Sequence, residues 1–195
     1  MNAIANLVSP SQAYVPLRLA GRPLALKAVV LVLGVAFLTA SSYVQVPMYP
    51  VPMTMQTFAV LAVGAFCGWR LGLATIVAWL ALAALNVPVL SEGKAGYLVF
   101  LGATGGYMAA FPLMAIFIGW MAEKGWTSRT VPAFLTLLVA DALCFIMGIA
   151  WLSTIVGFDK AIEYGLVPFA LGDLVKVFLA TAILTAGRRI APTRR

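Results

Sequence analysis

Two ionisable side chains stand inside an apolar run near the C-terminus, in the segment LGDLVKV. Asp173 and Lys176 are three residues apart, so in a helix both project from the same face. A charged residue near the centre of a bilayer costs at least ~2.5 kcal/mol on insertion scales, so a pair that persists there needs a reason. The reason is structural if the charges only neutralise each other or the lysine reaches the interface. We favour the alternative, a polar clamp for a ligand that carries both N–H and C=O groups.

A third ionisable residue, Asp141, lies near the middle of another apolar run, LLVADALCF. It can face a ligand, hydrogen-bond to a neighbouring helix, or be protonated in its apolar surroundings. The other polar candidates collect toward one side of the membrane, whereas the position of Asp141 is central. We therefore expect a hydrogen bond between helices from this residue more than a contact with a substrate.

Two further segments have features of a binding site. The segment 46–56, VPMYPVPMTMQ, contains three prolines, which lack the backbone N–H and can lie at the membrane edge without unpaired donors. It is either a lid or a tight connector. The second segment contains Asn86, Lys94 and the run Thr104, Gly105, Gly106, Tyr107. Tyr107 can add an aromatic wall with a hydroxyl, and the glycine pair allows close approach of either a ligand or a helix.

The composition indicates what surrounds these residues. Of the 195 residues, 63% are hydrophobic and 10% are charged, and the mean hydropathy is +1.03. A soluble domain has roughly a quarter of its residues charged, so an apolar solvent must surround most of this chain. The net charge of +7 does not indicate a nucleic acid partner, because the basic residues stand at the ends of apolar runs and not on one polar face.

Six apolar runs predict an all-α integral membrane protein, a bundle of six transmembrane helices in the lipid bilayer. The runs cover about 27–46, 55–68, 71–85, 104–121, 131–155 and 168–190. Only the turn around Trp69 separates the second from the third, and both are near or below the ~20 residues that span a bilayer upright. A transmembrane substrate-binding domain is thus predicted at 27–190, between an N-terminal tail, 1–26, without a cleavable targeting peptide and a basic C-terminal tail, 191–195.

The basic residues sort to one side of this arrangement. The tails and the loops around Arg70 and Arg129 hold most of the arginines and lysines, whereas the alternate loops hold Lys94 and Lys160, each beside a carboxylate. By the positive-inside rule both termini are cytoplasmic. The segments 47–53, 87–103 and 156–167 are then expected on the outer side.

The residue types that the chain lacks exclude or disfavour several functions. Histidine is absent, and Cys67 and Cys144 have no metal-ligand spacing, which disfavours a metal site, His-based catalysis and a nickel or cobalt carrier. The P-loop pattern does not occur, so energy from ATP would have to come through a partner. Ala36 and Ala40 are small residues at four-residue spacing, which lets another helix approach closely; in a six-helix bundle such spacing indicates internal packing more often than docking of a partner.

Three stretches taken together resemble the biotin-binding S components of energy-coupling-factor transporters: VPMYPVPMTMQTFAVLAVGAFCGWRLG, GATGGYMAAF and VPFALGDLVK. They are similar to that family's VPMTxQ, PTGGYxxGF and GDxxK motifs and occur in the same order. The resemblance extends from about Lys27 to the C-terminus. Two departures are Ala103, where the family usually has proline, and SEGKAG, which replaces a more glycine-rich loop.

This resemblance implies a non-enzymatic subunit of the bacterial cytoplasmic membrane that binds biotin near the outer face and needs no cofactor in this chain. It also implies a transmembrane T subunit and a pair of cytoplasmic ATPases as partners, with ATP bound by the ATPases. Asp173 and Lys176 match GDxxK as biotin contacts, and Lys94 and Asn86 are further candidates. Ala36 and Ala40 match the small-residue face that S components present to the T subunit.

The side chains of the predicted pocket suit an amphiphilic ligand. Asp173, Lys176, Lys94, Tyr107 and Tyr43 would supply polar groups at both ends of a pocket with an apolar middle. Other vitamins fit that description, so an S component for riboflavin, thiamine or another vitamin stays open. An intramembrane enzyme that uses Asp141 and Asp173 as acid and base, and a passive scaffold without any ligand, are the alternatives from other classes.

Overall fold

Residues 16, 17, 19 and 21–190 are described by a computed structural model of the chain, from 188 to 190 without their side chains. Most of the predicted N-terminal tail and all of the C-terminal tail lie outside these residues. Tail boundaries at 26 and 191 therefore stay predictions.

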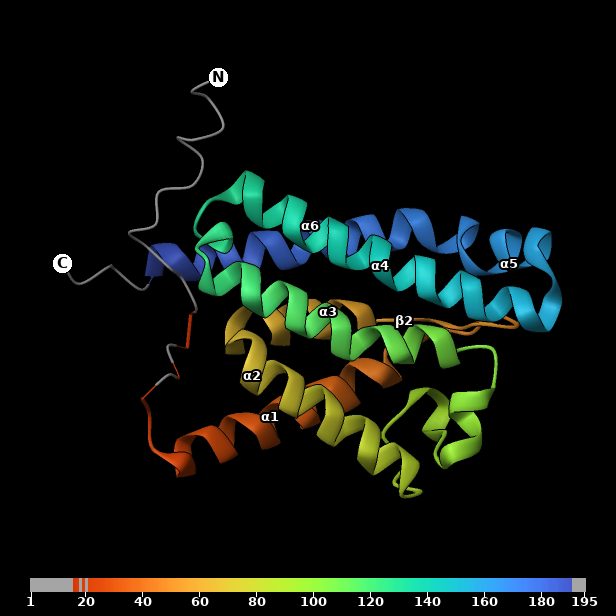
Figure 1. Cartoon of the computed structure of the whole chain (residues 1–195), viewed down its shortest axis with the longest axis horizontal. Coiled ribbons are helices and arrows are strands. Elements are labelled where there is room, and N and C mark those ends of the chain that lie inside the picture. Colours follow the sequence, from red (N-terminus) through yellow and green to blue (C-terminus); the bar gives the residue numbers. More distant parts are fainter. Residues whose placement is uncertain (1–15, 18, 20, 191–195) are drawn as a thin grey trace.

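The described residues form six α-helices and a two-stranded antiparallel sheet. They are α1 (Leu24–Tyr43), β1 (Gln45–Val46), β2 (Met53–Thr54), α2 (Gln56–Ala84), α3 (Gly105–Glu123), α4 (Thr130–Val156), α5 (Phe158–Gly165) and α6 (Val167–Ile190). The helix α1 begins and α6 ends at the same end of the bundle, and α5 lies at the opposite end (Figure 1). All helices except α5 are long and apolar enough to cross a membrane. The all-α prediction is confirmed at this level.

The helix α2 reverses direction near its middle, where Figure 1 shows the chain turning back. Gly68 has φ 74° and ψ 174°, a combination that is essentially limited to glycine, and it divides α2 into 56–67 and 69–84. The two segments pack closely, because a Cβ placed on Gly72 would lie 3.3 Å from the Cα of Gly64. The structure thus contains the predicted hairpin of two short helices within one continuous element.

We expect Gly68→Ala to lower the free energy of unfolding by about 1–3 kcal/mol, because a residue with a Cβ is strained at this φ and ψ. The turn has little room to relax, since a Cβ on Gly119 of α3 would already lie 2.2 Å from the backbone N of Trp69. Thermal unfolding of the purified protein in detergent measures the effect. Gly102→Ala is the control, since its φ of −81° suits any residue. Equal midpoints for the two variants would contradict the expectation.

The glycine pair Gly105 and Gly106 serves the packing of α3 on α4. A Cβ placed on Gly106 would lie 2.3 Å from the Cβ of Trp151 and 2.5 Å from the carbonyl oxygen of Met147. The indole N–H of Trp151 donates to the carbonyl of Gly102 at 2.9 Å, which fixes the start of α3 against α4. Of the two roles expected for these glycines, the structure shows approach of a helix.

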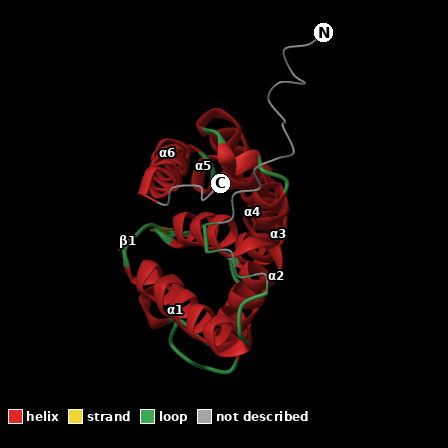
Figure 2. Ribbon diagram, turned by 90° about the vertical axis from the view of Figure 1, so that its left-hand side faces the viewer, coloured by secondary structure: helices red, strands yellow, loops and turns green. Residues whose placement is uncertain are grey.

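The helix α1 lies at the periphery of the bundle, apart from α3 and α4 in the end-on view of Figure 2. It packs mainly on α2. Its buried residues gather near its C-terminal end at Leu38, Ser41 and Ser42, whereas Val32 and Leu33 are exposed along its length. The result is a long apolar helix with most of its surface uncovered.

The three segments expected on the outer side differ from the plain loops that the sequence predicts. Pairing of Gln45 with Thr54 and of Val46 with Met53 places residues 47–52 at the tip of a hairpin and ends α1 at Tyr43, three residues early. The segment 87–103 contains two short 3-10 turns, Ser91–Gly93 and Tyr97–Leu101. The segment 156–167 contains α5, an additional short helix with Asp159 in its first turn, where a negative charge is favourable.

Candidate functional site

Asp173 and Lys176 form an ion pair in the interior of the bundle. The Nζ of Lys176 lies 2.5 Å from Oδ1 of Asp173. The side chain of Lys176 is 7% exposed and that of Asp173 is 4% exposed. Their i,i+3 spacing on α6 brings them together, as the sequence predicts. Taking two charges out of water costs several kcal/mol per ion, which is offset only when further hydrogen bonds hold the pair.

Thr57, in the first turn of α2, supplies those hydrogen bonds. Its hydroxyl donates to Oδ1 of Asp173 at 3.0 Å and accepts from Nζ of Lys176 at 3.1 Å. Lys176 therefore uses two of its three N–H donors. Among the described residues, nothing donates to Oδ2 of Asp173. We call Thr57, Asp173 and Lys176 the charged network; it retains one donor and one acceptor oxygen for a guest.

A cavity that is partly open to solvent lies beside the charged network. Three helices each present one face to it, with residues at separations of three and four. The lining residues from these three helices are Phe169, Asp173 and Lys176 of α6, Asp141, Cys144 and Phe145 of α4, and Tyr107, Met108 and Phe111 of α3; Gln56 and Thr57 of α2 also line the cavity. The cavity thus combines an aromatic body with a charged wall.

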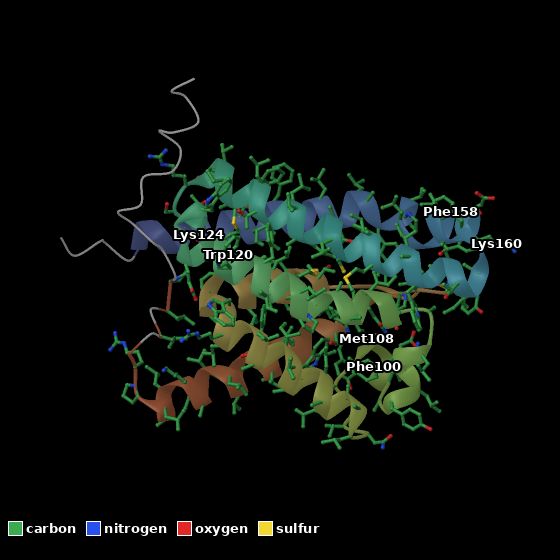
Figure 3. The ribbon with its side chains drawn as sticks, in the orientation of Figure 1. Phe100, Met108, Trp120, Lys124, Phe158 and Lys160 are labelled. Atoms are coloured by element: carbon green, nitrogen blue, oxygen red, sulfur yellow. The ribbon has the colours of Figure 1, made fainter. Side chains whose placement is uncertain are left out.

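The cavity lies toward the end of the bundle that carries α5. Met108, on the cavity wall, and Phe100 lie in the same half of the bundle as Phe158 and Lys160, away from Trp120 (Figure 3). The proline-rich connector covers this part of the site, because Val51 and Pro52 are buried and line the cavity with Thr54. This arrangement favours the lid over the tight connector.

Comparison with known proteins gives the family. Residues 12–193 match the BioY family. The chain belongs to the BioY family. A relative from Pyrococcus horikoshii, described as "Probable biotin transporter BioY", is 35% identical over 156 residues, which are 80% of this chain and 91% of the relative. The "Biotin transporter BioY" of Thermotoga maritima is 33% identical over 150 residues, 76% of this chain and 87% of the relative.

A solved structure has the same fold as this BioY family member. It is described as the S-component for biotin from an ECF-type ABC transporter, and the two chains superpose with a TM-score of 0.77 at 24% identity, covering 85% of this chain and 92% of the other. The family and the long apolar helices together make this chain a multi-pass membrane protein. Membership of a transporter family also confirms that the chain is not an intramembrane enzyme.

Four of the residues predicted to contact a ligand line the cavity of this family member: Asp173, Lys176, Tyr107 and Lys94. The hydroxyl of Tyr107 donates to the carbonyl of Gly165 at 2.9 Å, so the α5–α6 junction holds its ring against the cavity. Lys94 pairs with Glu92 at 2.6 Å, and its side chain is half exposed.

Tyr43 and Asn86, the other two predicted contacts, do not line the cavity. The hydroxyl of Tyr43 donates to the carbonyl of Pro88 at 2.5 Å and ties the end of α1 to the segment 87–103. Asn86 follows the last turn of α2 with φ 65°, a left-handed conformation that asparagine tolerates better than most residues. Both residues have structural roles in this conformation, and any contact with a ligand stays a prediction.

Thr57 was not predicted as a site residue, and Asp141 lies in a different neighbourhood from the one that its sequence position predicts. Thr57 directly follows the VPMTMQ motif, and a hydroxyl in the first turn of an apolar helix is the signal that could have found it. Asp141 lines the cavity, and its Oδ1 is buried without a hydrogen-bond partner. The hydrogen bond between helices that was expected from Asp141 is not formed by this oxygen.

Proposed function

We propose that this chain is the biotin-binding S component of an energy-coupling-factor importer in the bacterial cytoplasmic membrane. The observation that carries the proposal is the charged network opening onto an apolar cavity, with one lysine N–H and one carboxylate oxygen still free. The ureido ring of biotin offers a carbonyl and N–H groups to these two atoms, and its sulfur ring and chain suit the aromatic wall. The names of the BioY relatives support this choice of ligand.

The opposite end of biotin is a carboxylate, for which Lys94 is the proposed partner. Lys94 lines the same cavity but is half exposed, so its charge is little desolvated and can turn from Glu92 to a ligand at small cost. In this proposal the ring binds at the buried charged network and the tail lies toward the segment 87–103.

For the topology we propose six membrane-crossing segments with both termini in the cytoplasm. The reversal at Gly68 makes α2 two crossings. Lys124 lies 3.5 Å from the ring centroid of Trp120, and Arg70 lies 5.1 Å from that of Trp69. Tryptophan is enriched at both membrane interfaces, and basic residues are enriched on the cytoplasmic side. In Figure 3, Trp120 and Lys124 lie at the end opposite Lys160, in agreement with the sorting of charges along the sequence.

The proposed partners are a transmembrane T subunit and two cytoplasmic ATPases that bind ATP. The uncovered apolar face of α1 supports a docking role, and both Ala36 and Ala40 are exposed on it. Small residues there would let a partner helix approach closely.

Ala36→Trp is expected to abolish biotin uptake in cells that carry the complete transporter, because the indole would hold a partner helix away from α1. Biotin binding by the purified subunit is expected to stay within threefold of the wild type. Ile146→Trp, on an exposed face of α4, is the matched control and should leave uptake intact. Copurification of Ala36→Trp with a T subunit at the wild-type level would refute the docking role.

The proposed ligand is tested by native mass spectrometry of the purified protein and by calorimetry with biotin, riboflavin and thiamine. Retained biotin, with measurable binding of biotin alone, is the expected result. Selective binding of another vitamin would reassign the substrate. No retained molecule and no binding of any vitamin would indicate a scaffold.

A further inference from the structure

Asp141 is a carboxyl group of the cavity wall that does not take part in the charged network. The residue is 4% exposed, and its Oδ1 accepts no hydrogen bond from the described residues. Cys144 and Phe145, three and four residues further along α4, line the same cavity, so this face of α4 points inward. A buried polar atom without a partner costs free energy, and a guest in the cavity can supply the missing donor.

The charges near Asp141 leave it without a counter-ion. It interacts electrostatically with Asp173 and Lys176, but these two residues already neutralise each other at 2.5 Å. The other cation on the cavity wall, Lys94, pairs with Glu92. Within the described part of the chain, the cavity therefore carries one carboxyl group in excess.

A cyclic urea has one more donor than the charged network can accept. Its carbonyl oxygen accepts a hydrogen bond from the free N–H of Lys176, and one ring N–H donates to Oδ2 of Asp173. The second ring N–H is then left without an acceptor in the charged network. We propose that Asp141 accepts this second N–H and so determines specificity for rings that carry N–H on both sides of a carbonyl. The inference rests on the proposed function. It adds Asp141 of α4 as a third polar contact for the ligand, beside Asp173 and Lys176 of α6.

The test uses the full-length protein in detergent and three ligands: biotin and its two ring N-methyl derivatives, each of which lacks one N–H. Both derivatives are expected to bind the wild type at least tenfold more weakly than biotin does. Asp141→Ala removes the acceptor and makes room for a methyl group. In this variant biotin is expected to bind at least tenfold more weakly than in the wild type, and one derivative, but not the other, should bind as well as biotin.

Asp141→Asn keeps an oxygen at the same position and is expected to lose less affinity than Asp141→Ala. Asp159→Asn, an exposed carboxylate on α5, controls for loss of charge and should stay within threefold of the wild type. A biotin affinity for Asp141→Ala within threefold of the wild type would overturn the inference, as would a uniform loss for all three ligands. Failure of the wild type itself to bind biotin would overturn the proposed function instead.

Discussion

Asp173→Ala and Lys176→Ala are each expected to weaken biotin binding at least tenfold, or by about 1.4 kcal/mol. Each change removes one of the two free atoms that the charged network offers to the ureido ring, and each leaves the opposite charge buried without its partner at 2.5 Å. Breaking a buried pair in this way costs about 3–5 kcal/mol of stability. Calorimetry on folded protein and thermal unfolding in detergent measure the two effects separately.

The double variant Asp173→Ala with Lys176→Ala separates a ligand clamp from a purely structural pair. It leaves no unpaired charge, so we expect stability to recover toward the wild type. Biotin affinity should stay as low as in the single variants, because the donor and the acceptor are both gone. Recovery of both properties would show that the pair only holds α6 in place. Glu92→Ala breaks the exposed pair and is the control, with an expected stability change of about 1 kcal/mol or less.

Gly148→Ala is expected to weaken biotin binding at least tenfold although Gly148 does not line the cavity. A Cβ at this position would lie 2.2–2.4 Å from three carbons of the Tyr107 ring, so the ring must leave the cavity wall. Its hydroxyl would then lose the carbonyl of Gly165, at present 2.9 Å away. Calorimetry with biotin measures the loss.

Tyr107→Phe is the control for Gly148→Ala. It removes the hydrogen bond to Gly165 but keeps the ring, so we expect a smaller loss of biotin affinity than for Gly148→Ala. If Gly148→Ala bound biotin as tightly as the wild type, the ring of Tyr107 would not be part of the binding surface.

The sequence allowed the pairing of Asp173 with Lys176 to be predicted, because both lie on one helix and helical spacing alone brings them together. The helix hairpin in α2 was also predicted, since a glycine interrupts two short apolar runs. Thr57 could not be assigned in this way. It reaches the ion pair across 116 and 119 residues of chain, and only the packing of α2 on α6 decides that contact.

Asp141 and Tyr43 also show that the sequence does not tell which side chains face the cavity. Asp141 lines the cavity although this was not expected, and Tyr43 does not line it although this was expected. Depth along an apolar run indicated a central position for Asp141 but not which face of α4 would meet a cavity. Tyr43 had the right residue type near the right end of the bundle, yet its hydroxyl reaches the carbonyl of Pro88. A linear pattern gives depth and helix face, whereas the rotation of each helix against its neighbours comes from side-chain packing across the bundle.

The sparse burial of α1 has a thermodynamic consequence for any complex formed along it. Only 11% of the most apolar 18-residue stretch of α1 is buried inside the molecule. Lipid tails are as apolar as valine or phenylalanine, so replacing lipid with another helix at this surface gains no free energy from the hydrophobic effect. The free energy of such a complex must come from tight van der Waals contact and from lipid released by the two surfaces. An association of this kind can form and dissociate repeatedly without exposing apolar surface to water.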